Sequence, residues 1–231
     1  MDYFIQRNDA LSSAPVPNRC RRSHAACMTT NIRLFRHPVS GHCHRVELLL
    51  ALLGLPFERV EVDLLRGEQR KPEFLSKNPL GQVPVLEHGD DTVADSNAIL
   101  IYLALRYDQD GKYWPRDPGA AAHVQRWLSI AAGELVQGPG ALRLSALFKL
   151  PIDRPRAEQI SARLLKLLEA SLAQRAFLAA SKPTLADLAL YAYTARAPEG
   201  GVSLEAFPNV RAWLERIEAL PGFVAMQSTP S

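Results

Sequence analysis

A proline inside an apolar, strand-like run, Val83-Pro84-Val85, constrains the fold of this chain more than any other feature. Proline has no N–H for a strand ladder, so this residue must lie at a sheet edge or a bend. One arrangement that uses it is a cis Val83–Pro84 bond, which turns the backbone N–H and C=O of Val83 toward an open cleft. Such exposed groups can pair with an extended peptide ligand. The alternative is an ordinary edge-strand proline.

The pair Asp95-Ser96 follows a second short strand and a turn, and it precedes an apolar run typical of a helix. The N–H groups at a helix start, with the positive end of the helix dipole, can bind a carboxylate. The Asp95 carboxylate beside them can bind an ammonium group. A ligand with an amino-acid group at one end and a peptide-like middle therefore matches both halves of the stretch from Asn78 to Ser96. The same pair also suits a plain helix cap.

At this spacing, NPLGQVPVL followed by DSNAI resembles the glutathione site of the glutathione S-transferase family. In that family a (Q/K)-V-P strand carries a cis proline and an E/D-S pair begins the next helix. The resemblance covers about residues 31 to 225. It is to serine-type bacterial members similar to the phi, tau and zeta classes. It implies an α/β thioredoxin-like N-terminal domain (βαβαββα, a mixed four-stranded sheet) followed by an all-α helical C-terminal domain.

The hydrophobic pattern along the chain agrees with this order of elements. Ile32 to Phe35 predicts a strand, the apolar spacing up to Leu53 predicts a helix, and the alternation from Val60 to Leu64 predicts a strand parallel to the first. Beyond the prolines near residue 115 the pattern is helical, with expected breaks at Gly138-Pro139-Gly140 and after Leu150. The expected division is a leader or disordered tail (1–30), a glutathione-binding domain (31–108), a linker (109–118) and a helical domain (119–231).

Ser40 precedes the first predicted helix and stands five residues before Arg45-Val46. This S-x4-R-V spacing resembles the serine-type classes, and the resemblance implies that Ser40 is catalytic. A hydroxyl donor at a helix N-terminus lowers the pKa of a thiol, which is near ~8.5 when free. In classes that reduce disulfides or dehydroascorbate a cysteine takes this place. An isolated serine here would be a helix N-cap.

The resemblance also assigns the remaining binding residues. Gln82 and Val83 would contact the cysteinyl part of glutathione, Asp95 and Ser96 the γ-glutamyl part, and Gln69 and Arg70 the glycine carboxylate, with Pro84 as the structural cis-proline. Glutathione is the expected co-substrate. The electrophile pocket is expected in the helical domain, near residues 134–142.

Cys43 lies in the first turn of the predicted helix, and we expect a half-buried residue without a catalytic role. His37, His42 and His44 lie close to it in sequence. Neighbours one and two apart on a helix point to different sides, and a closed zinc site needs four convergent ligands. We therefore expect no metal.

The composition is that of a soluble globular protein, with 47% hydrophobic and 22% charged residues among 231. The formal net charge is +3, of which +2 falls in residues 1–30, so the nearly neutral body predicts neither nucleic acid nor membrane as a partner. Three cysteines without a C-x-x-C pair fit a reducing cytoplasm. We interpret residues 1–27 as a leader that results from a start codon assigned too far upstream, or as a disordered arm. A transit peptide is a weaker alternative.

The function that we expect is glutathione transfer to a small hydrophobic electrophile, by a homodimer. Two alternatives stay open on the sequence. One is a glutathione-dependent isomerase or a peroxide or disulfide reductase on the same fold, and the other is a non-catalytic glutathione transferase-like binding protein.

Overall fold

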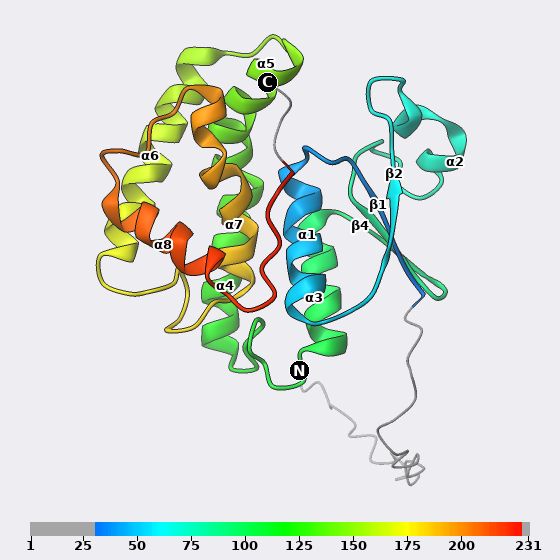
Figure 1. The fold of residues 1–231 in the computed structure, drawn as a ribbon, viewed down its shortest axis with the longest axis horizontal. Coiled ribbons are helices and arrows are strands. Elements are labelled where there is room, and N and C mark those ends of the chain that lie inside the picture. Colours follow the sequence, from blue (N-terminus) through cyan, green and yellow to red (C-terminus); the bar gives the residue numbers. More distant parts are fainter. Residues whose placement is uncertain (1–30, 228–231) are drawn as a thin grey trace, which may run out of the picture.

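The computed structural model describes residues 31–227. The first half of this range is built on a four-stranded sheet of order β2-β1-β3-β4 (Figure 1). The predictions for residues 1–30, and for Cys20 and Cys27, concern a part of the chain outside the described residues. The elements of the first half are β1 (Ile32–Arg36), α1 (Gly41–Leu52), β2 (Glu58–Glu61), η1 (Glu68–Arg70), α2 (Pro72–Leu75), β3 (Val85–His88), β4 (Asp91–Ala94) and α3 (Ser96–Tyr107).

The sheet is mixed, as the sequence predicts. β1 pairs in parallel with β2 and antiparallel with β3, and β3 pairs antiparallel with β4. The second strand ends at Glu61, earlier than the alternation to Leu64 predicts, although the Val62 N–H still donates to the Arg36 carbonyl at 2.8 Å. The central strand β1 and its neighbour β3 bury Leu34 and Leu86 completely. The βαβαββα order is confirmed.

The second half is helical throughout, which is also confirmed. Asp117 and Asp153 cap the first two long helices, and a proline follows each cap within the first turn. The elements are α4 (Pro118–Ala132), η2 (Val136–Gly140), α5 (Ala141–Phe148), α6 (Arg154–Leu172), α7 (Leu185–Ala195), η3 (Ala197–Gly200) and α8 (Pro208–Glu218).

The predicted break at Gly138-Pro139-Gly140 is wrong. These residues form the π-helical segment η2, which runs directly into α5, and all three are buried. A Cβ on Gly138 would lie 2.9 Å from Ser161 Oγ and 3.0 Å from Ser161 N. Gly138 therefore serves close packing against α6, and the sequence alone cannot separate this use of glycine from a helix break.

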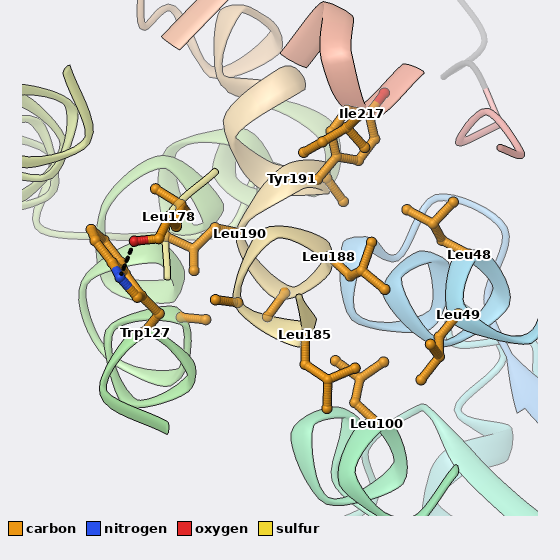
Figure 2. Close-up of a cluster of buried hydrophobic side chains, with 14 of the residues drawn as sticks. Leu48, Leu49, Leu100, Trp127, Leu178, Leu185, Leu188, Leu190, Tyr191 and Ile217 are labelled. Atoms are coloured by element: carbon orange, nitrogen blue, oxygen red, sulfur yellow. Dashed lines mark hydrogen bonds between the residues drawn. The ribbon is translucent and has the colours of Figure 1, made fainter. Parts of the chain in front are cut away.

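The two halves share one continuous hydrophobic core (Figure 2). Leu49 of α1 and Leu100 of α3 are fully buried, as are Leu185 and Leu188 of α7, which face them. Figure 1 shows α1 and α3 between the sheet and the helical half. Because this contact is apolar and closely packed, it holds the loop before α1 in a defined position against α7. No helix within residues 31–227 is long and apolar enough to cross a membrane.

Candidate active site

Ser40 is the N-cap of α1, with extended backbone angles. Its Oγ accepts a hydrogen bond from the Cys43 N–H at 3.3 Å, and its own N–H donates to the His37 carbonyl at 3.0 Å. A hydroxyl group has two acceptor lone pairs and one hydrogen, so a capping serine keeps its hydrogen for donation. The capping role is therefore compatible with donation to a ligand.

The start of α1 packs closely against α7. A Cβ on Gly41 would lie 2.9 Å from Cε2 of Tyr193, so a larger residue at this position would push α7 away. The Tyr193 ring also meets the His42 ring edge to face, with centroids 5.1 Å apart. Tyr193 is buried, and burial raises its pKa. The helical half thus forms one wall beside Ser40.

The Val83–Pro84 peptide bond is cis, which confirms the arrangement proposed from the sequence. The ladder of β3 begins at Val85, so the N–H and C=O of Val83 lie outside it. The preceding loop is held by Asn78, whose Nδ2 donates to the Gln82 carbonyl at 2.7 Å. The backbone of Val83 is therefore available just before the start of β3, which is an inner strand of the sheet.

Asp95 is the N-cap of α3 and has a φ of 75°. Its Oδ1 accepts hydrogen bonds from the backbone N–H groups of Asn97 and Ala98, both at 2.9 Å. Within residues 31–227, Oδ2 has no hydrogen-bond partner, and the side chain is exposed. One carboxylate oxygen is thus committed to the helix and the other can meet a ligand. Ser96 beside it is buried, with 3% of its surface exposed.

Arg45 lies beneath the start of α3 and is fully buried. Its Nη1 donates to Ser96 Oγ at 3.3 Å and to Asn97 Oδ1 at 2.9 Å. Its Nε and Nη2 have no hydrogen-bond partner within residues 31–227, and burial lowers its pKa to about 10. A buried cation without a bonded carboxylate favours a negatively charged ligand nearby. The sequence motif contains Arg45, but the spacing did not reveal this contact.

His42 is a second residue that the sequence did not assign. Its Nδ1 lies 3.2 Å from Ser96 Oγ, so a residue of α1 and the first residue of α3 meet across the cleft. Burial, together with the nearby Arg45 charge, lowers the pKa of His42 to about 3. The imidazole is therefore neutral at physiological pH.

One cavity of about 420 Å³ joins these features. Six of the residues predicted from the sequence line it, namely Ser40, Gln69, Gln82, Val83, Asp95 and Ser96. Pro84 lines a smaller adjoining cavity of about 250 Å³. Arg70 is exposed at the end of η1 and lines neither of these two cavities. Gln69 Oε1 is buried there without a hydrogen-bond partner in the described part of the chain, which suits a polar ligand.

The opposite wall of the cavity is mainly apolar and comes from α4, η2, α5 and α7. Its residues are Ala132, Val136, Leu144, Phe148 and Tyr193. The segment expected from the sequence, 134–142, contributes Val136. Glu134 instead faces α6, where it lies 3.7 Å from Arg163. No sequence pattern separates the lining residues from their neighbours on the same helices.

Cys43 is fully buried, whereas we expected it to be half-buried. Its sulfur accepts a hydrogen bond from the His37 N–H at 3.4 Å, and burial raises the thiol pKa to about 12. A thiol in this state is a weak nucleophile. Within residues 31–227 no cluster of three or more His, Cys, Asp or Glu side chains is placed to bind a metal ion.

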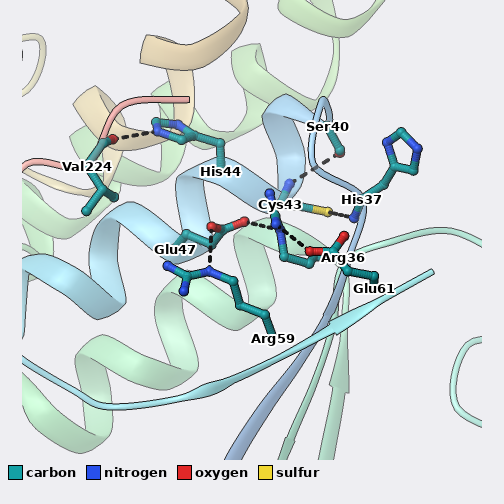
Figure 3. A network of polar contacts seen from close by, with 9 residues as sticks. All are labelled: Arg36, His37, Ser40, Cys43, His44, Glu47, Arg59, Glu61 and Val224. Atoms are coloured by element: carbon teal, nitrogen blue, oxygen red, sulfur yellow. Dashed lines mark hydrogen bonds and ion pairs between the residues drawn. The ribbon is translucent and has the colours of Figure 1, made fainter. Parts of the chain in front are cut away.

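An ion-pair network supports the loop that carries Ser40 (Figure 3). Arg36 at the end of β1 pairs with Glu47 of α1 at 2.6 Å and with Glu61 of β2 at 2.7 Å. Glu47 also meets Arg59 at 3.4 Å. The network links β1, α1 and β2 directly below the loop. It stabilises the position from which Ser40 faces the cavity.

Comparison with known proteins gives matches over most of the chain. The glutathione S-transferase N-terminal domain matches residues 30–105, and the C-terminal domain matches residues 149–221. Glutathione S-transferase 3 of Zea mays is 34% identical over 203 residues, which cover 83% of this chain and 91% of that protein.

Two solved structures are similar at the level of the fold. A glutathione S-transferase from Pseudomonas fluorescens has a TM-score of 0.80 and 32% identity, over 85% of this chain and 99% of that one. A glutathione transferase homologue from Drosophila mojavensis, solved with bound glutathione, has a TM-score of 0.74 and 30% identity, over 83% and 89% of the two chains.

The fold is a thioredoxin-like N-terminal half with a four-stranded mixed sheet, followed by a helical C-terminal half. With these matches, the chain belongs to the glutathione S-transferase family and is an enzyme of that family.

Proposed function

We propose that the enzyme binds glutathione in the cavity beside Ser40, ionises its thiol, and adds the thiolate to a small hydrophobic electrophile. The observation that carries this proposal is the convergence of three separate sequence motifs on one cavity. Ser40, the backbone of Val83 and the Asp95-Ser96 helix start all line it. The glutathione-bound homologue from Drosophila mojavensis supports the choice of ligand.

The peptide part of glutathione is assigned to the segment just before β3 and to the start of α3. The backbone of Val83, with Gln82 beside it, pairs with the cysteinyl residue, because these groups lie outside the strand ladder. Asp95 binds the γ-glutamyl ammonium through its free Oδ2, and Ser96 binds the γ-glutamyl carboxylate at the positive end of α3. The buried Arg45 guanidinium behind Ser96 adds favourable charge.

The glycine carboxylate is assigned to Gln69 and Arg70 of η1. Of the two, Gln69 lines the cavity, while Arg70 is exposed. The direct contact is therefore given to Gln69, through its amide Nε2. That nitrogen makes a bond of 3.4 Å to the Leu64 carbonyl, which is long enough to be exchanged for a carboxylate.

Thiol activation follows from the geometry of Ser40. Its Oγ accepts the Cys43 N–H, so its hydrogen is free to donate to the glutathione sulfur. Donation to the thiolate and the nearby α1 N-terminus both stabilise the ionised form and lower the thiol pKa. The thiol proton passes to solvent, and the sulfur then attacks an electrophilic carbon held against the apolar wall. In a substitution the leaving group departs with the bonding electrons, and in an addition the carbon skeleton gains a proton from solvent.

The direct test measures glutathione consumption with a panel of small aromatic and alkyl electrophiles. Ser40→Ala should lower turnover roughly 100-fold, as removal of one catalytic hydrogen-bond donor does, with little change in glutathione affinity. Ser40→Thr is the matched control, since it keeps a hydroxyl group and should retain most of the activity. Unchanged turnover in Ser40→Ala would reject the role of Ser40.

Three alternatives to glutathione transfer can be told apart. A disulfide or peroxide reductase that works through a mixed disulfide needs a reactive cysteine, and the one cysteine within residues 31–227, Cys43, is buried with a raised pKa. A glutathione-dependent isomerase would regenerate glutathione, whereas transfer consumes it. A non-catalytic binding protein would bind glutathione without turnover of any electrophile.

The cellular setting is part of the same proposal and rests on family resemblance. The enzyme works as a homodimer in the cytoplasm and detoxifies small electrophiles. Size-exclusion chromatography with light scattering tests the oligomeric state. A monomer with full activity would contradict the proposed homodimer.

A further inference from the structure

Two side chains of α1 converge on one hydroxyl group at the start of α3. Arg45 Nη1 and His42 Nδ1 lie 3.3 Å and 3.2 Å from Ser96 Oγ. Ser96 itself is buried and lines the cavity. A hydroxyl group offers two acceptor positions and a single hydrogen, so the two neighbours decide where that hydrogen points.

Arg45 can only donate, because a guanidinium group has no acceptor. His42 can either donate or accept through Nδ1, depending on the tautomer of its neutral ring. If Nδ1 accepts, the only hydrogen of Ser96 is directed at His42 and none remains for a ligand. If Nδ1 donates, the oxygen of Ser96 accepts from both neighbours and its hydrogen is directed into the cavity.

We infer that His42 is a positioning residue, which donates from Nδ1 to Ser96 and thereby directs the Ser96 hydroxyl hydrogen at the γ-glutamyl carboxylate of glutathione. Since the site of that carboxylate belongs to the proposed function, this inference rests on it. The edge-to-face contact with Tyr193 at 5.1 Å holds the imidazole ring in the required orientation. The ring stays neutral at physiological pH, so Nδ1 acts as a dipolar donor beside the Arg45 charge.

The test compares two variants that differ at the atom in question. In His42→Asn, the side-chain amide places a donor close to the position of Nδ1, while His42→Leu places none there. Dissociation constants are measured by calorimetry for glutathione and for an analogue with 4-aminobutanoyl in place of γ-glutamyl, which lacks only the carboxylate. Thermal melting of each variant shows whether it is folded.

For glutathione, His42→Leu should raise the dissociation constant about 10- to 150-fold, as expected for one hydrogen bond to a charged group. His42→Asn should stay within about threefold of the original protein. For the analogue all three proteins should bind alike. His37→Leu, which removes another cavity histidine without touching Ser96, should leave the ratio of the two dissociation constants unchanged.

If His42→Leu weakened the binding of glutathione and of the analogue by the same factor, the role of His42 would be merely structural and the inference would be overturned. Unchanged glutathione binding in His42→Leu would also overturn it. Failure of the original protein to bind glutathione at all would instead reject the proposed function, so the two failures are distinguishable.

Discussion

Asp95 has two separable tasks, and replacing it with asparagine removes only one of them. Its Oδ1 caps α3 through two hydrogen bonds of 2.9 Å, and its Oδ2 is assigned to the ammonium group of glutathione. The amide oxygen of asparagine can accept the same two backbone bonds, and asparagine tolerates the observed φ of 75°. Asp95→Asn therefore keeps the cap and loses the charge.

The expected cost to stability is small. Loss of a negative charge at a helix N-terminus costs about 0.3–1 kcal/mol at an exposed position. Asp95→Ala is the matched comparison, because it also loses the cap, about 1 kcal/mol, and leaves a positive φ without a tolerant residue, about 1–3 kcal/mol. Its unfolding free energy should fall by roughly 2–5 kcal/mol, which lowers Tm by about 4–20 °C for a protein of this size.

In Asp95→Asn, glutathione binding should lose more free energy than folding does. A hydrogen bond between charged groups contributes about 1.5–3 kcal/mol, and the exposure of Asp95 favours the lower end. Calorimetry should then show glutathione binding about tenfold weaker in Asp95→Asn. A glutathione analogue without the amino group should bind the original protein and the variant equally. Glutathione binding unchanged in Asp95→Asn, or melting as low as that of Asp95→Ala, would refute the reasoning.

Three further predictions concern buried residues that do not line the cavity. Arg143→Leu removes the 2.8 Å bond from Nη1 to the Val39 carbonyl, next to Ser40, so kcat should fall more than tenfold, while Arg143→Lys should restore part of it in kinetic assays. Burial lowers the pKa of His44 to about 4, so the unfolded state binds more protons below pH 6.5 and stability falls from there toward pH 4. His44→Gln can keep the bond to the Val224 carbonyl and should flatten this slope in urea unfolding, and an unchanged slope would contradict it. Asp187→Ala leaves four donors without an acceptor and should cost about 4 kcal/mol or more in the same assay.

Local chemistry explains why much of the fold could be predicted from the sequence. The cap at Asp95, the start of the helix at Ser96 and the strand Ile32–Arg36 each depend on neighbours within a few residues. The break at Gly138 was predicted wrongly, because its glycine is required by contact with α6, which lies far along the chain.

The same distinction applies to the site. Ser40, Val83 and Asp95 occur in short motifs, so the order of residues along the chain is enough to select them. His42 acts on Ser96 across 54 positions of sequence, and no spacing within α1 reveals such a contact. The apolar wall is built by single residues from α4, η2, α5 and α7, whose side chains resemble those of the surrounding core. Only the three-dimensional structure shows which of these residues line the cavity.

The most direct test of the central claim is the pKa of the glutathione thiol in the bound state. Ultraviolet absorbance of the thiolate can be followed against pH for the original protein, Ser40→Ala and Ser40→Thr, each saturated with glutathione. The account predicts that the bound thiol ionises about one to two pH units below the free thiol in the original protein and in Ser40→Thr. In Ser40→Ala the bound thiol should ionise nearer to the free value, because only the α1 N-terminus still lowers its pKa. Equal ionisation curves for the original protein and Ser40→Ala would contradict it.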